Sequence, residues 1–361
     1  MIGLRSALVL SMVGGLSGFA TQCTPRKPPL PVVATPPAPV KAGPEIGVTA
    51  TPVPLDAANP AKTTLEGGFA YAGGLALTSA DTTRLHGLSD LAVGAGGQLM
   101  AISDEGDLFE ARLQLDQAGR LVGLTDGKLR PLTGLNGQPL QGKRESDAEG
   151  LAVLPNGDRL VSFEGNHRIW LYPAQPGGAW GTPRPAPKPA TVFPDNEGME
   201  ALSAYPAAGP DAYLVGGEEG EVWLCRLSAD CKSLPPQSGP DFTWGLTGFA
   251  PFEGTAVGTL HRGFDPIRGW RAVVRFISDP TKPLAQQRTT AALHIDGAAP
   301  RDNFEGLALT RSPTGGTRLY LLSDDGAIGN QRTLLLAFDW TPQPLPQPMS
   351  TPVKKRPVRR R

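Results

Sequence analysis

A short acidic phrase recurs along this chain, and each copy opens an apolar run. Its fullest form, Glu-Gly-Leu-Ala, begins at Glu149 and again at Glu305, and successive copies start 47 to 60 residues apart. A repeat of this period indicates one supersecondary unit copied several times, which brings equivalent positions to one place. The first position of each copy carries an oxygen-bearing side chain: Ser89, Glu149, Glu200, Thr247 and Glu305.

A second equivalent position closes the next strand-like run of each unit. It holds Asp104, Glu164, Glu218, His261 and Asp324, and further acids lie near the first position at Asp90, Asp147, Glu197 and Asp302. Converging carboxylates must be protonated or neutralised by a cation. Oxygen-only ligands suit a hard ion such as Ca²⁺ rather than zinc. The candidate metal ligands are Asp90, Asp104, Glu149, Glu164, Glu200, Glu218, Glu305 and Asp324.

A simpler interpretation of these acids remains open. Glu-Gly pairs are common in turns, so each acid alone could cap a solvent-exposed turn. The matching position in unit after unit favours a shared site instead.

Cationic side chains flank the same segments and could bind a phosphate or another anion. The candidates are Lys143, Arg144, Arg168, His261, Arg262 and Arg301. Ordinary ion pairing with the abundant acids is the alternative. A histidine titrates near neutral pH, so His167 could protonate a leaving alkoxide. The candidate catalytic residues are His167, Glu149 and Glu305.

The elements that must position these side chains are short strands. Each unit repeats an apolar strand, a polar turn, a second strand ending in an acid, a tight turn and a third strand. In the second unit the three runs cover 150–154, 159–163 and 167–172. Three or four antiparallel strands per unit of about 50 residues is typical of a propeller blade.

We therefore predict an all-β protein, a β-propeller with five blades, in which the first strands line a central channel. The run 69–77 could add an outer strand to the last blade and close the ring, since an open ring would leave exposed strand edges. Six blades remain possible if 61–85 and 278–300 hold a degenerate unit. A linear β-solenoid fits less well, because its repeats are usually shorter.

The chain ends predict export. Residues 1–23 have the apolar core of a signal peptide, and Cys23 offers lipidation as an alternative that would anchor the protein to a membrane in the cell envelope. Residues 24–60 contain eleven prolines and are expected to be a linker. Residues 342–361 are expected to be a proline-rich, basic, disordered tail after a propeller domain of 61–341. We expect a periplasmic or lipid-anchored protein; the oligomeric state stays open.

The cysteines and the net charge exclude further classes of function and indicate the compartment. Cys225 and Cys231 are six residues apart and are expected to form a disulfide in an oxidising compartment. Residues 61–341 carry 24 basic and 32 acidic side chains, a net charge of −8 that argues against nucleic-acid binding. No Cys/His cluster, Gly-x-Ser-x-Gly elbow or phosphate-binding glycine loop occurs in the sequence, which disfavours zinc, serine-esterase and nucleotide chemistry.

Several longer phrases resemble the phytase-like family of exported bacterial proteins, described as having esterase-like activity of phytase. The matching segments are 147–153, 160–170, 263–271, 302–309, 321–325 and 331–338, within a resemblance covering 66–340. The resemblance implies a periplasmic propeller with acid-rich sites, and it adds Asp325 to Glu149, Glu164, Glu200, Glu305 and Asp324 as candidate acids. The family phrase Ser-Asp-Asp continues with Asn-Phe, whereas here residues 326–329 read Gly-Ala-Ile-Gly.

Three functions stay open at this point. The first is Ca²⁺-dependent hydrolysis of a small phosphate ester, in kinship with calcium-dependent propeller phytases. The second is a non-catalytic binding propeller with structural Ca²⁺. The third is hydrolysis of a carboxylic ester or lactone with Ca²⁺ as the Lewis acid.

Overall fold

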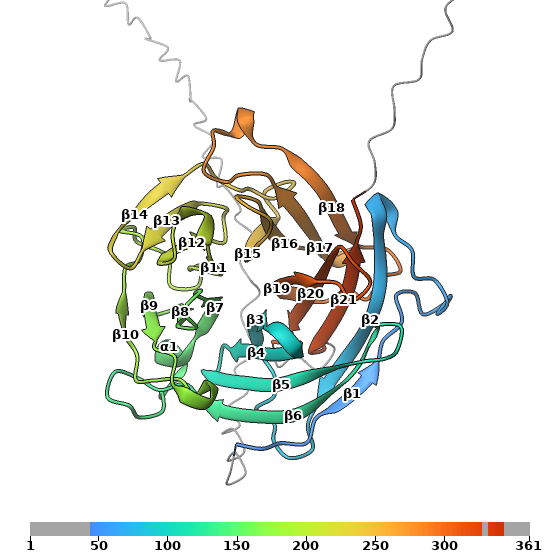
Figure 1. The fold of residues 1–361 in the computed structure, drawn as a ribbon, viewed down its shortest axis with the longest axis horizontal. Helices are drawn as coiled ribbons and strands as arrows, with labels where there is room; N and C mark the ends of the chain where they lie inside the picture. The colour runs from blue at the N-terminus through green and yellow to red at the C-terminus, as the bar shows by residue number, and fades with distance from the viewer. Residues whose placement is uncertain (1–43, 327–330, 343–361) are drawn as a thin grey trace, which may run out of the picture. The chain divides into compact units, whose positions relative to one another are not determined.

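The structure is a computed structural model that describes residues 44–326 and 331–342. Across these ranges the strands form five antiparallel sheets arranged around a central axis (Figure 1). The first strand of each sheet is nearest the axis, and neighbouring first strands contact one another all round the ring. This is a five-bladed β-propeller, which confirms the fold predicted from the repeat.

Each of the first four blades is one continuous stretch of chain. Blade 1 contains β3 (Leu88–Val93), β4 (Gln98–Ser103), β5 (Asp107–Leu115) and β6 (Leu121–Pro131). Blade 2 contains β7 (Ala148–Val153), β8 (Arg159–Phe163), β9 (Arg168–Tyr172) and β10 (Arg184–Ala186). Blade 3 contains β11 (Ala201–Ala204), β12 (Ala212–Gly216), β13 (Val222–Arg226) and β14 (Ala229–Leu234). Blade 4 contains β15 (Trp244–Pro251), β16 (Val257–Asp265), β17 (Gly269–Ile277) and β18 (Thr289–Ile295).

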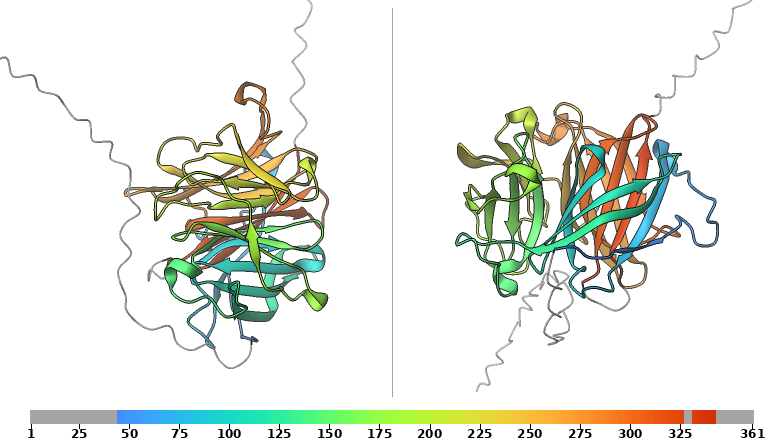
Figure 2. Two further views of the ribbon diagram at one scale, coloured as in Figure 1. Left: turned by 90° about the vertical axis from the view of Figure 1, so that its left-hand side faces the viewer. Right: turned by 60° about the horizontal axis from the view of Figure 1, so that its bottom comes forward.

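Blade 5 joins the two ends of the ring. It contains β19 (Asn303–Arg311), β20 (Thr317–Asp324), β21 (Leu334–Trp340), β2 (Phe69–Thr78) and β1 (Thr49–Pro52). The blue strand β2 lies beside the red strand β21 in Figure 2, with Leu75 opposite Leu335. Both leucines are fully buried, so closure is held by packing as well as by backbone hydrogen bonds. The prediction that 69–77 closes the ring is confirmed.

The expected linker of residues 24–60 ends earlier than the sequence indicated. Residues 49–52 form β1, which pairs with β2 as the outermost strand of blade 5, and Ile46 and Leu55 are buried. Proline is compatible with this position because an edge strand pairs on one side only. The predicted signal peptide, Cys23 and most of the predicted tail lie outside the described residues.

Helices are few and short among the described residues. They are α1 (Lys143–Ser146) and the 3₁₀ turns η1 (Glu66–Gly68), η2 (Ala95–Gly97), η3 (Pro176–Gly178), η4 (Pro206–Ala208) and η5 (Leu284–Gln286). No helix in the described ranges has the length and apolar character to span a membrane.

The apolar core lies between the blades. Buried side chains form a separate cluster at each interface between neighbouring blades, for example Ile102 of blade 1 with Leu151 and Phe163 of blade 2. Because both faces of an inner strand pack against neighbours, these strands are continuously buried instead of alternating, as β8 and β20 are throughout. At the periphery a disulfide joins Cys225 of β13 to Cys231 of β14.

Candidate functional site

The repeated acidic position coincides with a β-bulge. In blades 1, 2, 4 and 5 the register between the first and second strands shifts at one extra residue on the first strand. These bulge residues are Ser89, Glu149, Thr247 and Glu305, the first position of the sequence repeat. In blade 3, Glu200 directly precedes β11. A bulge redirects its side chain out of the regular pleat, which explains why this position carries a polar side chain inside a buried strand.

The glycine that follows the bulge allows adjacent blades to approach closely. A Cβ atom on Gly150 would lie 2.6 Å from the Leu202 Cβ of blade 3, and one on Gly306 would lie 3.1 Å from the Asp90 Cα of blade 1. In the phrase Glu-Gly, the bulge therefore redirects the glutamate side chain, and the glycine has no side chain to obstruct the neighbouring blade.

The second position of the repeat is acidic in four blades and basic in one. The residues before the bulges pair with Ser103, Phe163 and Ser323 in blades 1, 2 and 5, and with His261 in blade 4. The next residue along each second strand occupies the axial position: Asp104, Glu164, Asp324 and, in blade 4, Arg262. The sequence repeat predicted His261 for this position, but the observed register places Arg262 there, one residue later.

Three buried acids of blade 2 form the densest part of the site. Asp147, Glu149 and Glu164 each place a carboxylate oxygen within 4.8 Å of the other two, and all three side chains are buried. We call them the acidic triad. Asp147 ends α1, Glu149 is the bulge of β7, and Glu164 directly follows β8. Three carboxylates with no nitrogen or sulfur ligand suit a hard divalent cation.

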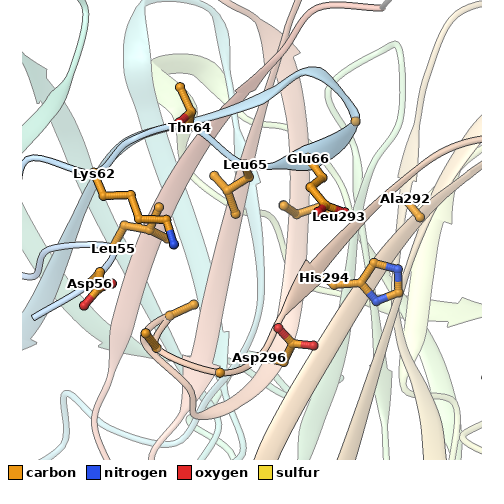
Figure 3. A pocket seen from close by; sticks show the side chains of 14 residues that line it. Leu55, Asp56, Lys62, Thr64, Leu65, Glu66, Ala292, Leu293, His294 and Asp296 are labelled. Carbon is orange, nitrogen blue, oxygen red and sulfur yellow. The ribbon is translucent and has the colours of Figure 1, made fainter. Parts of the chain in front are cut away.

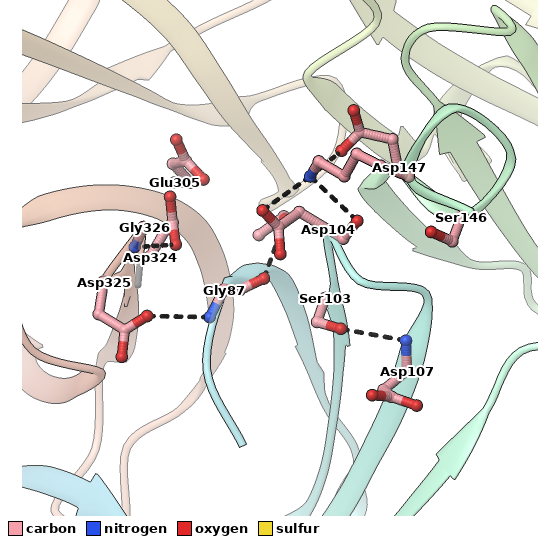
Figure 4. Close-up of polar contacts among 12 residues, drawn as sticks. Gly87, Ser103, Asp104, Asp107, Ser146, Asp147, Glu305, Asp324, Asp325 and Gly326 are labelled. Carbon is pink, nitrogen blue, oxygen red and sulfur yellow. Dashed lines mark hydrogen bonds and ion pairs between the residues drawn. The ribbon is translucent and has the colours of Figure 1, made fainter. Parts of the chain in front are cut away.

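Lys143 is the nearest cation to the acidic triad. Its Nζ lies 2.6 Å from Asp147 Oδ1 and 2.8 Å from Asp104 Oδ2, so it joins blades 1 and 2 (Figure 4). Burial opposes its charge, but the carboxylates of Asp104, Asp147 and Glu149 outweigh that effect and raise the pKa of Lys143. Lys143 is therefore a fixed positive charge at the rim of the triad.

Arg262 of blade 4 is the second cation that contacts the axial acids, after Lys143. Its Nη2 lies 3.0 Å from Glu218 Oε1 and its Nε lies 3.3 Å from Glu305 Oε1. Asn303 donates from Nδ2 to Glu305 at 2.9 Å and to Asp324 at 3.1 Å. Figure 4 shows Glu305 and Asp324 facing the same space as Asp104 and Asp147. Asn303 thus orients Glu305 and Asp324 by hydrogen bonds, whereas Arg262 neutralises Glu218 and Glu305 as ion pairs, because its Nε and Nη2 make no hydrogen bond within the described residues.

The axial carboxylates act on one another. Burial raises the pKa of Glu149, and repulsion from Glu200, Asp147, Glu164 and Glu305 raises it further. The structure therefore brings the acids of blades 2, 3 and 5 together. In the described residues the axial group contains eight acids and two cations, so protons or an added cation must balance it. The acids are Asp104, Asp147, Glu149, Glu164, Glu200, Glu218, Glu305 and Asp324, and the cations are Lys143 and Arg262.

Two predicted metal ligands make structural contacts instead. Asp90 is buried and accepts hydrogen bonds from the backbone N–H of Leu91 and of Leu151 in the next blade, each at 2.8 Å. Asp325 accepts from the N–H of Gly87 at 3.0 Å and from the hydroxyl of Thr333 at 3.0 Å. These carboxylates fasten neighbouring segments together.

Most of the predicted anion-binding cations are engaged elsewhere. The Arg168 guanidinium lies 4.0 Å from the Phe163 ring centroid and 4.3 Å from that of Trp170, and it donates to the backbone carbonyl of Asn166. Arg301 donates to the carbonyl of Arg268, at the protein surface. Arg144 of α1 is exposed, and its backbone and Cγ lie next to Gly165.

The two predicted histidines each bond a backbone carbonyl. His261 is completely buried in blade 4, and its Nε2–H donates to the Gln237 carbonyl at 2.7 Å. His167 lies beside Glu164 across Gly198, and its Nε2 bonds the Pro194 carbonyl at 2.9 Å. Its ring also packs on Phe193. The roles predicted from the sequence, proton donation by His167 and substrate binding by His261, stay predictions.

Sequence reasoning did not single out Asn303. The signal was present, because Asn303 lies inside the phrase Asp-Asn-Phe-Glu that ends at the bulge residue Glu305. Its amide bridges Glu305 and Asp324, while Oδ1 is buried and has no hydrogen-bond partner among the described residues. Asp147 was noticed only as a nearby acid, although the structure places it in the triad.

Comparisons with solved structures find propellers at low sequence identity. Streptogramin B lyase is 9% identical, with 71% of this chain and 94% of that chain covered and a TM-score of 0.36. The Cps50 (Swd1) propeller domain of Myceliophteria thermophila is 12% identical, with 85% and 99% covered and a TM-score of 0.38. The PQQ-bound aldose sugar dehydrogenase of Streptomyces coelicolor is 14% identical, with 82% and 99% covered and a TM-score of 0.37. A search of curated proteins gave no significant match.

A family comparison is more specific. The family model described as "Esterase-like activity of phytase" matches residues 83–327, which include every axial acid from Asp104 to Asp324. With a match over more than half of its length, the chain belongs to the phytase-like family.

Proposed function

We propose that this protein binds a divalent cation, Ca²⁺ by preference, at the acidic triad. The single observation that carries the proposal is the convergence of Asp147, Glu149 and Glu164 in a buried, oxygen-only cluster. The cluster fits such an ion chemically, since Ca²⁺ takes six to eight oxygen ligands and three carboxylates offer six oxygens. The raised pKa of Glu149, caused first by burial and then by its acidic neighbours, supports a need for added positive charge.

We further propose that the cation-loaded protein hydrolyses a small phosphate ester. A divalent cation bound at the triad would polarise the ester oxygen that it contacts and offset the charge of an anionic substrate. Membership of a family described by esterase-like activity of phytase supports hydrolysis. The substrate itself stays a proposal.

The chain's own residues provide orientation and charge. Glu305 is oriented by Asn303 and neutralised by Arg262, and we assign it as the axial carboxylate that would accept a proton from an attacking water. Glu149 would bind the cation. His167 remains the predicted proton donor, although its Nε2 is bonded to Pro194 and it would have to act through Nδ1.

A second candidate is hydrolysis of a carboxylic ester or lactone, which carries less charge than a phosphate ester. One observation favours it. Arg168 is enclosed by two aromatic rings, and Arg262 is paired with two glutamates, so neither guanidinium is available to bind a phosphate group. Arg144, which is exposed, and Lys143 remain as anion-binding candidates.

We also propose that the protein is exported to the periplasm or anchored in the cell envelope through Cys23. The apolar segment before Cys23 and the Cys225–Cys231 disulfide support an oxidising compartment.

Calorimetric titration of the purified protein with Ca²⁺, paired with activity assays, tests both parts of the proposal. Turnover of a general phosphomonoester and of a carboxylic ester is measured with Ca²⁺ and again with excess chelator. Glu149→Gln is expected to weaken Ca²⁺ binding at least about ten-fold and to remove activity. Glu253→Gln, an exposed acid of blade 4, is the matched control and should change neither.

The outcomes separate the candidates. Chelator-sensitive turnover of the phosphomonoester supports the first proposal, and turnover of the carboxylic ester alone supports the second. Ca²⁺ binding at the triad with no turnover of either substrate would indicate a binding propeller with a structural ion. Unchanged Ca²⁺ affinity in Glu149→Gln would show that Ca²⁺ does not bind at the acidic triad.

A further inference from the structure

The hairpin that joins β16 to β17 projects beyond the axial acids. In blades 1 and 2 the second strand ends beside the axial residue, at Ser103 and Phe163, whereas β16 continues past Arg262 to Asp265. Three further residues, at about 3.3 Å each, carry this strand about 10 Å past the axial position. We call residues 263–271 the blade 4 hairpin.

The blade 4 hairpin is apolar at its tip. Ile267 is 95% exposed, and Phe264 is 46% exposed on the strand that leads to it. Phe264 lies directly opposite Trp270 in the register, with the two ring centroids 5.0 Å apart. An exposed aliphatic tip next to an aromatic pair is typical of segments that lie at a membrane interface.

Other exposed apolar side chains lie at the same end of the propeller. Phe242 is 83% exposed and lies two residues before Trp244, which pairs with Gly263 of the hairpin. Val192 is 95% exposed and lines a pocket together with the axial acid Glu218. Large apolar side chains exposed at one end of a protein indicate a surface that meets another molecule or a membrane.

Polar contacts hold the tip of the hairpin in place. Asp265 Oδ1 accepts hydrogen bonds from the backbone N–H groups of Ile267 and Arg268, each at 2.8 Å. Arg301 donates to the backbone carbonyl of Arg268. The turn therefore presents Ile267 outward in a fixed geometry, so little further ordering is needed when this side chain enters an apolar phase.

The tip is basic, although the propeller as a whole is acidic. Arg268 and Arg301 are exposed, and the one acid in the sequence of the hairpin, Asp265, is bonded to the turn itself. Arginines beside exposed apolar side chains are complementary to an anionic lipid surface. The axial acids lie about 10 Å from the tip, more than the Debye length of about 8 Å at physiological salt, so they are largely screened from such a surface.

The outer edge of blade 4 has the opposite charge. A groove of about 890 Å³ between β18 and the segment that leads into β2 is lined by three acids, Asp56, Glu66 and Asp296, and by one lysine, Lys62 (Figure 3). This groove would repel an anionic surface, so the hairpin is the part of blade 4 that suits one.

We propose that the blade 4 hairpin docks this protein on an anionic lipid surface. Ile267 would insert among the acyl chains, while Arg268 and Arg301 contact the headgroups. Phe264 and Trp270 would lie at the level of the interface, where aromatic rings are favoured. This docking requires no cation at the acidic triad, so it is independent of the function proposed above.

An environment-sensitive dye at the tip tests this inference. In the full-length protein with Cys23→Ser, Ile267→Cys provides the one free thiol, because Cys225 and Cys231 form a disulfide. Phosphatidylglycerol vesicles are expected to shift the dye's emission to shorter wavelength, and phosphatidylcholine vesicles to bind at least about five-fold more weakly.

Leu284 provides the matched control position for the dye. It is 56% exposed and belongs to η5, which follows the far end of β17 from the hairpin. The dye on Leu284→Cys is therefore expected to keep its emission when vesicles are added.

Charge variants of the protein labelled at position 267 measure the contribution of the arginines. Arg268→Gln is expected to weaken the apparent affinity for phosphatidylglycerol vesicles about five-fold. Lys62→Gln removes one positive charge from the groove at the outer edge of blade 4 and should leave the affinity unchanged.

Unchanged emission at position 267 with phosphatidylglycerol vesicles would overturn the inference, as would equal responses of the dye at positions 267 and 284. A response at position 267 that needs no lipid and grows with protein concentration would assign the tip to a second copy of this chain, and would likewise overturn it. Equal affinities of Arg268→Gln and its parent would show that the hairpin does not recognise anionic headgroups.

Discussion

Arg262 Nε lies 3.3 Å from Glu305 Oε1, so a basic residue of blade 4 neutralises the bulge acid of blade 5. The same guanidinium reaches Glu218 of blade 3 at 3.0 Å. Burial acts against the charge of Arg262, but these carboxylates outweigh it and raise its pKa. One arginine thus ties three blades together at the axis, in the position that acids occupy in the other four blades.

Replacing this arginine should destabilise the propeller. Arg262→Gln leaves Glu218 and Glu305 without their counter-charge, and removing one partner from a buried ion pair costs on the order of 3 kcal/mol of unfolding free energy. Urea denaturation at neutral pH measures the effect. Arg288→Gln, on the exposed surface, is the control and should change the unfolding free energy little. A loss of the same size in both variants would show that Arg262 has no special role at the axis.

Lys143 should compete with a cation for the acidic triad. Its Nζ already lies 2.6 Å from Asp147 Oδ1, so a divalent ion that uses Asp147 must share or displace that contact. Lys143→Met is therefore expected to increase Ca²⁺ affinity by about ten-fold, measured by calorimetric titration. Lys128→Met, an exposed lysine of β6, should leave the affinity unchanged. Weaker binding in Lys143→Met would mean that the lysine orients Asp147 for the ion.

The repeat could be recognised in the sequence because the same local geometry, a bulge followed by a close approach of two blades, requires similar residues in each copy. Glu149 and Glu305 are bulge residues, and the glycines after them allow the next blade to approach. Ring closure by 69–77 was readable from strand pattern and the cost of an open edge. β1 was not, because its single proline, Pro52, resembles those of the linker before it, and its pairing with β2 is what distinguishes it.

The acids of the site were more predictable than its cations. Their position follows from the repeat, whereas the environment of a long cationic side chain depends on residues distant in sequence. Arg168 meets two aromatic rings, and the register of β15 with β16 places Arg262, rather than His261, at the axis. In blades 1 and 2 the second strand ends beside the axial residue, whereas β16 continues past Arg262 to Asp265, so no turn marks the axial position in the sequence of blade 4.

The glycine of the repeated phrase should not tolerate a side chain. A Cβ on Gly150 would lie 2.6 Å from Leu202 Cβ and 3.0 Å from the Glu200 carbonyl oxygen of blade 3. Gly150→Ala is expected to cost about 1–3 kcal/mol of unfolding free energy by forcing two first strands apart. Gly94→Ala is the control, because its Cβ would meet ordinary contacts of 3.7 Å and its φ is −87°. Equal stability of the two variants in urea denaturation would contradict the close approach of blades 2 and 3.

His261 should make the stability of the fold depend on pH. Burial, then the nearby positive charge of Arg275, lowers the pKa of His261 to about 3. The unfolded chain binds a proton at this residue below about pH 6.5, whereas the folded protein does not until about pH 3. The contribution of neutral His261 is therefore complete above pH 6.5 and is lost as the pH falls towards 3.

Between pH 7 and pH 4 this single histidine is expected to remove roughly 3 kcal/mol of unfolding free energy. His261→Gln keeps a donor for the Gln237 carbonyl but cannot titrate, so its unfolding free energy should fall less steeply over that range. His294→Gln replaces an exposed histidine and should retain the steep dependence of the parent protein. Urea denaturation at pH 4, 5, 6 and 7 compares the three proteins. Parallel pH profiles for His261→Gln and the parent would show that the buried imidazole is not the group responsible.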